Sequence, residues 1–244
     1  MSFADPSIII PAAVAALLVG LAKNGVPGLG ILVVPLMAHA FPPRDSVGVL
    51  LPMLITGDLL AILLYRRHAQ WRKLLTLLPY VLVGMIGAGW VLSRLDNETF
   101  RPLLGGLILL LLGLELLRMY KRWHHLPHHP AFTGTVGTAA GFATTLGNAA
   151  GPIMNIYLLS RELPKHQFVG TAAWFFFVVN CSKAPLYWHL DMITTDSLRF
   201  NLVMIPLIAT GAWLGVRLLP VIPQRLFTGL VLGLTAVAAL SLLL

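Results

Sequence analysis

Hydrophobic runs separated by short polar turns follow one another along the whole chain. A membrane-spanning helix needs about 20 consecutive apolar residues, and six runs have this length. They are Ser46–Tyr65, Leu74–Ser93, Phe100–Met119, Gln167–Tyr187, Leu198–Leu219 and Gln224–Leu243. The pattern therefore predicts an all-α, polytopic membrane protein.

Four further runs are too short to cross a membrane individually, and they come in two pairs. Ser7–Ala22 is followed by Leu29–Phe41, and Ala131–Gly147 is followed by Ile153–Ser160. Glycines and prolines interrupt the chain between the members of each pair. We expect each pair to be a broken or re-entrant helix pair whose members meet inside the membrane.

The order of runs in the first half repeats in the second half. Corresponding positions recur at shifts of 121 to 127 residues: Gly20 with Gly141, Ala22 with Ala143, Gly30 with Gly151, Asp58 with Asn180, Tyr65 with Tyr187, Pro79 with Pro206 and Gly84 with Gly211. Each half has five segments, so the second half should be inverted relative to the first. We predict a first repeat over residues 1–120, a cytoplasmic linker over 121–130 and a second, inverted repeat over 131–244.

The distribution of Lys and Arg predicts the orientation, because cytoplasmic loops carry an excess of both. One side of the predicted topology collects Lys23, Arg66, Arg67, Arg72, Lys73, Arg118, Lys121, Arg122, Arg161, Lys165, Arg217 and Arg225. The other side collects only Arg44, Arg94, Arg101, Lys183 and Arg199. The basic side should be cytoplasmic, with both termini on the extracytoplasmic side. The charge pattern does not decide whether the short segments cross fully or re-enter.

Composition narrows the class of function. Only 11% of the residues are charged, against roughly 25% in soluble domains. The net charge of +8 is explained by basic cytoplasmic loops, so we expect no nucleic-acid partner. There is no Gly-Lys-Ser/Thr phosphate loop, which argues against a built-in ATPase. The N-terminal run lacks a basic n-region and a cleavage site, so we expect a retained helix.

The two interrupted pairs are the candidate binding site. A helix that restarts inside a membrane presents free N–H groups and the positive end of its dipole, which suit a small anion. The candidate ligands are the polar and glycine residues of the two breaks: Lys23, Asn24, Gly25, Gly28, Gly30, Thr144, Thr145, Asn148 and Gly151. The alternative is that the breaks are only tight turns and that Lys23 extends to the cytoplasmic interface.

Several other polar residues have competing interpretations. Asp58 lies inside a span, where an ionisable group indicates function by default, and it could pair with Lys23, titrate during transport or bind a coupling cation. Its counterpart Asn180 suggests a shared coupling or gating position. We expect Lys183 to extend to the outer interface, and Glu115 to pair with Arg118 at a helix end.

The central histidines do not make a strong metal site. His124, His125, His128 and His129 lie among prolines, without a nearby cysteine or acid. We expect an interfacial linker, no bound metal and no cofactor. The single Cys181 excludes an internal disulfide.

The two motifs resemble those of the TauE/SafE family, also called the TSUP family, of sulfite and sulfonate exporters. The resemblance is carried by Gly20–Gly30 with Pro35, Pro43 and Asp58, and by Gly141–Pro152 with Pro164 and Gly170. It implies a bacterial inner-membrane permease for sulfite, sulfoacetate and related organosulfonates, with proton- or ion-linked movement as a family-level expectation.

The sequence therefore predicts a secondary transporter of small anions, not an enzyme, that works by alternating access. Its partners would be the anion, the lipid bilayer and, in a homo-oligomer, further copies of the chain. The alternatives are a passive anion channel, a metal-dependent integral-membrane enzyme that uses the histidine cluster, and a scaffold subunit without flux of its own.

Overall fold

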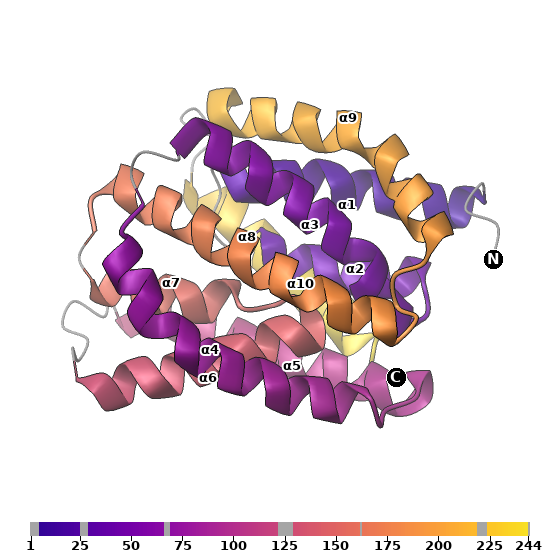
Figure 1. The fold of residues 1–244 in the computed structure, drawn as a ribbon. Coiled ribbons are helices and arrows are strands. Elements are labelled where there is room, and N and C mark those ends of the chain that lie inside the picture. The colour runs from indigo at the N-terminus through magenta and orange to yellow at the C-terminus, as the bar shows by residue number, and fades with distance from the viewer. Residues whose placement is uncertain are drawn as a thin grey trace.

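The computed structural model describes residues 5–24, 29–65, 69–121, 129–161, 163–218 and 224–243, and within these ranges all regular structure is α-helical. Ten helices follow one another (Figure 1): α1 Pro6–Asn24, α2 Gly30–Ala40, α3 Pro43–Tyr65, α4 Trp71–Leu92, α5 Asn97–Lys121, α6 Pro130–Gly147, α7 Gly151–Ser160, α8 Lys165–His189, α9 Thr195–Leu218 and α10 Gln224–Leu240.

Five of the described helices, α1, α3, α4, α5 and α9, are long and apolar enough to cross a membrane. Helix α8 has 25 residues but is not among them, and its sequence includes the polar residues Asn180 and Lys183. Helix α10 has 17 residues. The chain is a polytopic helical membrane protein, as the hydrophobic pattern predicts.

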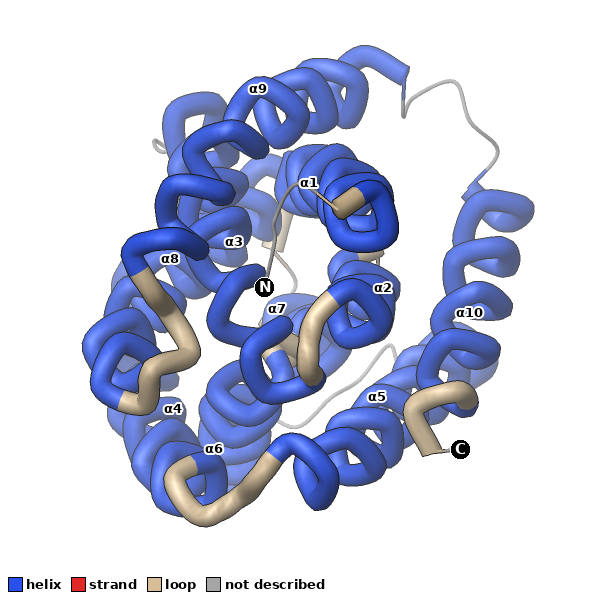
Figure 2. Tube along the Cα trace, turned by 90° about the vertical axis from the view of Figure 1, so that its right-hand side faces the viewer, coloured by secondary structure: helices blue, strands red, loops and turns tan. Residues whose placement is uncertain are grey.

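Helices α2 and α7 are half-length helices. They contain 11 and 10 residues, or about 15 Å at 1.5 Å per residue, which is half of the roughly 30 Å hydrocarbon core. Their partners α1 and α6, with 19 and 18 residues, extend further than the short runs in the sequence indicate. In Figure 2, α2 and α7 lie in the middle and the other helices surround them. The irregular backbone that precedes α7, at Asn148–Ala150, is therefore covered by protein, as the cost of exposing it to lipid requires.

The break between α6 and α7 is built by a left-handed residue. Asn148 has φ 54°, a conformation that asparagine tolerates better than most side chains do. The N–H groups of Asn148 and Ala149 bond to the carbonyl oxygens of Thr144 and Ala143, so the last turn of α6 keeps its hydrogen bonds. Pro152 then occupies the first turn of α7, where its missing N–H has no cost.

Glycines bring helices of the two halves into close contact at two interfaces. Helix α1 packs against α9, and α4 packs against α6. A Cβ atom at Gly20 or Gly211 would clash with the carbonyl oxygen of Ile208 or Leu17, and one at Gly84 or Gly141 would clash with that of Thr138 or Val81. Gly20 of α1 corresponds to Gly141 of α6 at a shift of 121 residues, and Gly84 of α4 corresponds to Gly211 of α9 at a shift of 127 residues. The contact between α1 and α9 therefore corresponds to the contact between α6 and α4.

The remaining packing has the same correspondence. Helix α3 packs against α8, and α5 packs against α10, so each of these helices contacts its own counterpart. The start of α1 and the end of α10 lie at the same end of the bundle, on the right of Figure 1. The division into repeats at residues 120 and 131 stays a prediction.

Candidate functional site

The two half-length helices begin at one cavity of about 120 Å³. Gly30 and Gly151, the first residues of α2 and α7, line it, and a Cβ atom at either glycine would meet nothing within 4 Å. The N-cap residues are Leu29 and Ala150, and neither caps its helix with a side chain. Two positive helix ends with uncapped N–H groups therefore converge on one space, as an anion site requires.

Lys23 supplies a formal charge to this cavity. It is a lining residue at the end of α1, and its Nζ lies 2.6 Å from Oδ1 of Asp58 and 4.1 Å from the centroid of the Phe176 ring. Asp58 is fully buried. Its other oxygen accepts a hydrogen bond of 2.7 Å from the amide of Asn180. Of the three possibilities that the sequence left open for Asp58, the structure shows the pairing with Lys23.

A second lysine lies behind the other break. Lys183 is fully buried, and its Nζ donates to the carbonyl oxygen of Thr144 at 2.9 Å, to Thr144 Oγ1 at 3.0 Å and to Asn148 Oδ1 at 2.6 Å. The expectation that Lys183 extends to the outer interface is wrong. Its ammonium group has three hydrogens, and three oxygens of the α6 break take them up, which makes the interior position tolerable.

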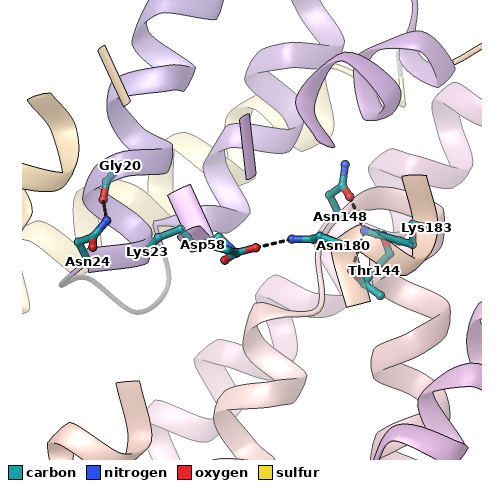
Figure 3. A network of polar contacts seen from close by, with 8 residues as sticks. All are labelled: Gly20, Lys23, Asn24, Asp58, Thr144, Asn148, Asn180 and Lys183. Carbon is teal, nitrogen blue, oxygen red and sulfur yellow. Dashed lines mark hydrogen bonds and ion pairs between the residues drawn. The ribbon is translucent and has the colours of Figure 1, made fainter. Parts of the chain in front are cut away.

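These residues form three bonded groups that follow one another across the middle of the molecule (Figure 3). Asn24 bonds to Gly20, Asp58 bonds to Lys23 and Asn180, and Lys183 bonds to Thr144 and Asn148. Among the described residues, the only charged side chains that bond to the cavity lining are Lys23, Asp58 and Lys183. With both lysines protonated and Asp58 ionised, the buried cluster carries one net positive charge, which favours an anion in the cavity.

The structure places the predicted site residues unequally. Lys23, Gly30, Thr144, Asn148, Gly151 and Asn180 line the cavity. Asp58 lies directly behind this lining. Asn24 and Thr145 are buried away from it: the Asn24 amide bonds to the carbonyl oxygen of Gly20, and the Thr145 carbonyl accepts from the hydroxyl of Tyr187. Gly25 and Gly28 lie outside the described residues.

Sequence reasoning missed two contributors. Asn155 lines the cavity from α7, is only 9% exposed and makes no hydrogen bond within the described part of the chain. The sequence did indicate this residue, because Asn155 is the only amide side chain in the mostly apolar α7. The second is the inward position of Lys183, because the place of a residue near the end of a span does not show which way its side chain points.

The other candidates lie apart from this cavity. Glu115 pairs with Arg118, which confirms the predicted helix-end ion pair. His124, His125 and His128 lie outside the described residues, and His129 caps the start of α6. Within the ranges that the structure describes, no group of three His, Cys, Asp or Glu residues could hold a metal ion.

Comparison with known proteins gives one family-level match. Neither the curated proteins nor the solved structures contain a match to the chain. The family model described as "Sulfite exporter TauE/SafE" matches residues 12–242, which include both helix breaks, Lys23, Asp58 and Lys183. The chain therefore belongs to the sulfite exporter TauE/SafE family, a family of membrane transporters.

Proposed function

We propose that this protein is a secondary transporter that moves a small anion, of the sulfite or organosulfonate class, across a bacterial inner membrane by alternating access. The observation that supports this proposal most directly is the convergence of two uncapped helix starts and Lys23 on one cavity. In this proposal the N–H groups at Gly30 and Gly151 and the side chains of Thr144, Asn148 and Asn155 are donors to the anion.

The internal correspondence of the halves supports alternating access. In transporters built from inverted repeats, the two repeats exchange conformations around a fixed central site. Here Asp58 and Asn180 occupy corresponding positions and bond to each other, as residues close to a two-fold axis would. We propose that residues 1–120 and 131–244 are the two repeats and that they rock against each other around this contact.

The Lys23–Asp58 pair is the proposed coupling and gating element. Lys23 belongs to α1 and Asp58 to α3, so a relative movement of these helices would break their 2.6 Å contact. A buried charge that loses its partner is costly unless a ligand or a proton replaces that partner. Binding of the anion beside Lys23, or protonation of Asp58, would therefore favour such a movement.

The thermal stability of the purified protein against an anion panel tests this proposal. A ligand that binds only the folded state raises the Tm by mass action. We expect a selective rise with sulfite or with a sulfonate, and none with chloride. The Lys23→Ala variant should bind the anion at least tenfold more weakly, because a hydrogen bond to a charged group contributes about 1.5–3 kcal/mol. Its Tm should therefore rise less at the same anion concentration.

Two further variants separate binding from folding. Lys23→Ala alone leaves Asp58 unpaired, whereas Lys23→Ala/Asp58→Asn removes both charges and should fold better. Arg72→Ala, an exposed basic residue at the start of α4, is the control and should bind like the wild type. Normal anion-induced stabilisation of a folded Lys23→Ala protein would contradict the proposed site. Flux in liposomes that does not saturate with anion concentration would indicate a channel instead.

A further inference from the structure

One helix gives the cavity an apolar wall. Phe168, Val169, Ala172, Ala173 and Phe176 all line it, and their spacing of one, four, five and eight positions places them on one face of α8. Leu54 of α3 and Ile31 of α2 extend this surface. A bare inorganic oxyanion would leave such a surface without a partner, so the wall suits a ligand that also carries hydrocarbon.

The polar lining comes mainly from other helices. Lys23 belongs to α1, Thr144 and Asn148 to the end of α6, and Asn155 to α7. Asn155 is more than nine-tenths buried and makes no hydrogen bond in the described part of the protein, which is costly unless a ligand or a water molecule bonds to it. The cavity therefore combines a place for an anionic head group with a place for an apolar group.

The charge of the cluster sets the charge of the ligand. Lys23, Lys183 and Asp58 together carry one net positive charge when all three are ionised. A ligand with one negative charge would neutralise them, whereas a dianion would leave an uncompensated buried charge. Lys23 is the only charged residue of the described lining, so a second charged group on the ligand would find no partner at the apolar wall.

We propose that the ligand is an organic monoanion with a short apolar group, such as an alkanesulfonate of one to three carbons, in preference to inorganic sulfite, to dianions and to zwitterions. This inference rests on the proposed anion site and specifies its substrate class. The size of the cavity sets the limit on the tail. A single water molecule needs about 10–15 Å³ of such space, so about 120 Å³ holds a small head group and a few carbons.

The test measures the affinity of the full-length protein for a matched series by titration calorimetry or by Tm shift. The series contains sulfite, methanesulfonate, ethanesulfonate, propanesulfonate, sulfoacetate as a dianion and taurine as a zwitterion. Burial of one methylene is worth about 0.8 kcal/mol, so each added carbon should tighten binding about fourfold until the cavity is full. Sulfoacetate and taurine should bind at least tenfold more weakly than propanesulfonate.

A pair of variants on α8 tests whether the apolar wall is responsible. Val169→Thr places a hydroxyl group in the wall at almost constant volume, and it should reduce the gain in affinity per added methylene to less than twofold. Val178→Thr makes the same change on the same helix at a residue outside the lining, and it should keep the full gain.

The outcomes separate this inference from the proposed function. An increase of affinity along the alkanesulfonate series, lost in Val169→Thr and kept in Val178→Thr, would support both. Tighter binding of sulfite or sulfoacetate than of ethanesulfonate would overturn the inference and leave the anion transporter standing. Binding of none of these compounds by the folded wild-type protein would contradict both.

Discussion

At the scale of single residues, Lys183 shows how a charge is kept inside a membrane protein. Among the described residues, its ammonium group donates hydrogen bonds only to neutral oxygens: the carbonyl and hydroxyl of Thr144 and the side-chain oxygen of Asn148. The Asn148 amide in turn donates to the carbonyl oxygen of Val47 at 2.8 Å. Lys183 thus fixes the end of α6 to α8, and Asn148 fixes it to α3.

This arrangement predicts a loss of anion binding in Lys183→Met. The variant removes the net positive charge of the cluster and frees the Asn148 side chain, so affinity for the best alkanesulfonate should fall tenfold or more. The Tm without ligand should change less, because the relief of a buried charge offsets the lost hydrogen bonds. Calorimetric titration and thermal denaturation give the two values.

A neighbouring substitution controls for damage to α8. Ser182→Ala removes a hydroxyl that bonds only to the carbonyl oxygen of Val178, and it should bind like the wild type. Affinity equal to that of the wild type in a folded Lys183→Met protein would show that Lys183 has a purely structural role.

The polar residues also show what sequence reasoning can reach. The pairing of Lys23 with Asp58 was predictable, because a carboxylate inside an apolar span needs a cation and the nearest break offers one. The inward direction of Lys183 was not predictable, because it depends on how α6 and α8 approach each other. Thr145 lies next to Thr144 in sequence, yet one helical step of about 100° turns its side chain away from the cavity lining.

At the scale of helices, close packing takes the place of the hydrophobic effect in holding the helices together. Lipid tails are as apolar as leucine side chains, so membrane helices associate through close contacts between small residues. Gly84 brings α4 against α6, and Gly211 brings α9 against α1. These contacts hold α1 against α9 and α6 against α4.

The glycine contacts predict a sharp difference between two neighbouring positions on α4. A Cβ atom at Gly84 would clash with the carbonyl oxygen of Thr138, whereas one at Gly87 would meet nothing within 4 Å. Gly84→Ala should therefore lower the Tm by roughly 5 °C or more, since overpacking costs about 1–3 kcal/mol. Gly87→Ala, the matched control, should leave the Tm unchanged or raise it, because alanine favours helix more than glycine does. Equal effects of the two variants on thermal denaturation would contradict the close α4–α6 contact.

The helices were largely predictable and their lengths less so. Glycine, proline and lysine inside apolar runs indicate the positions of both breaks, and the described starts of α2 and α7 lie at Gly30 and Gly151. The sequence runs ended α1 at Ala22, but the helix continues through Lys23 and Asn24. A charged and a polar residue at the end of an apolar run indicate a loop. In the structure Lys23 pairs with Asp58, and the Asn24 amide bonds to the carbonyl oxygen of Gly20, so both residues can remain helical inside the protein.

At the scale of the whole molecule, the correspondence of the halves explains why the cavity is central. If a two-fold axis in the membrane plane relates residues 1–120 to residues 131–244, corresponding helix starts must meet near that axis. Gly30 and Gly151 meet at one cavity, and Asp58 contacts Asn180. The sequences of the halves differ at these points, with Lys23 opposite Thr144 and Asp58 opposite Asn180. If the two halves are inverted repeats, the charge would be asymmetric on a symmetric backbone. The inward-open and outward-open conformations would then differ in energy.

The proposed inversion has a consequence for topology that can be measured on intact cells. An odd number of segments in each half returns both termini to one side, and the start of α1 and the end of α10 lie at the same end of the bundle. The basic ends of α4 and α7 lie at the opposite end. Because cytoplasmic loops are rich in Lys and Arg, that opposite end should face the cytoplasm. Asp196, at the start of α9, should then face outward.

Single cysteines in a Cys181→Ser background test this orientation with a membrane-impermeant maleimide. Asp196→Cys and Arg72→Cys place a thiol at two exposed positions on opposite ends of the bundle. We expect Asp196→Cys to react in intact cells, and Arg72→Cys to react only after the membrane is permeabilised. The reverse pattern would invert the topology, and labelling of both positions in intact cells would contradict a fixed orientation. In either case the assignment of the basic loops to the cytoplasmic side would have to be revised.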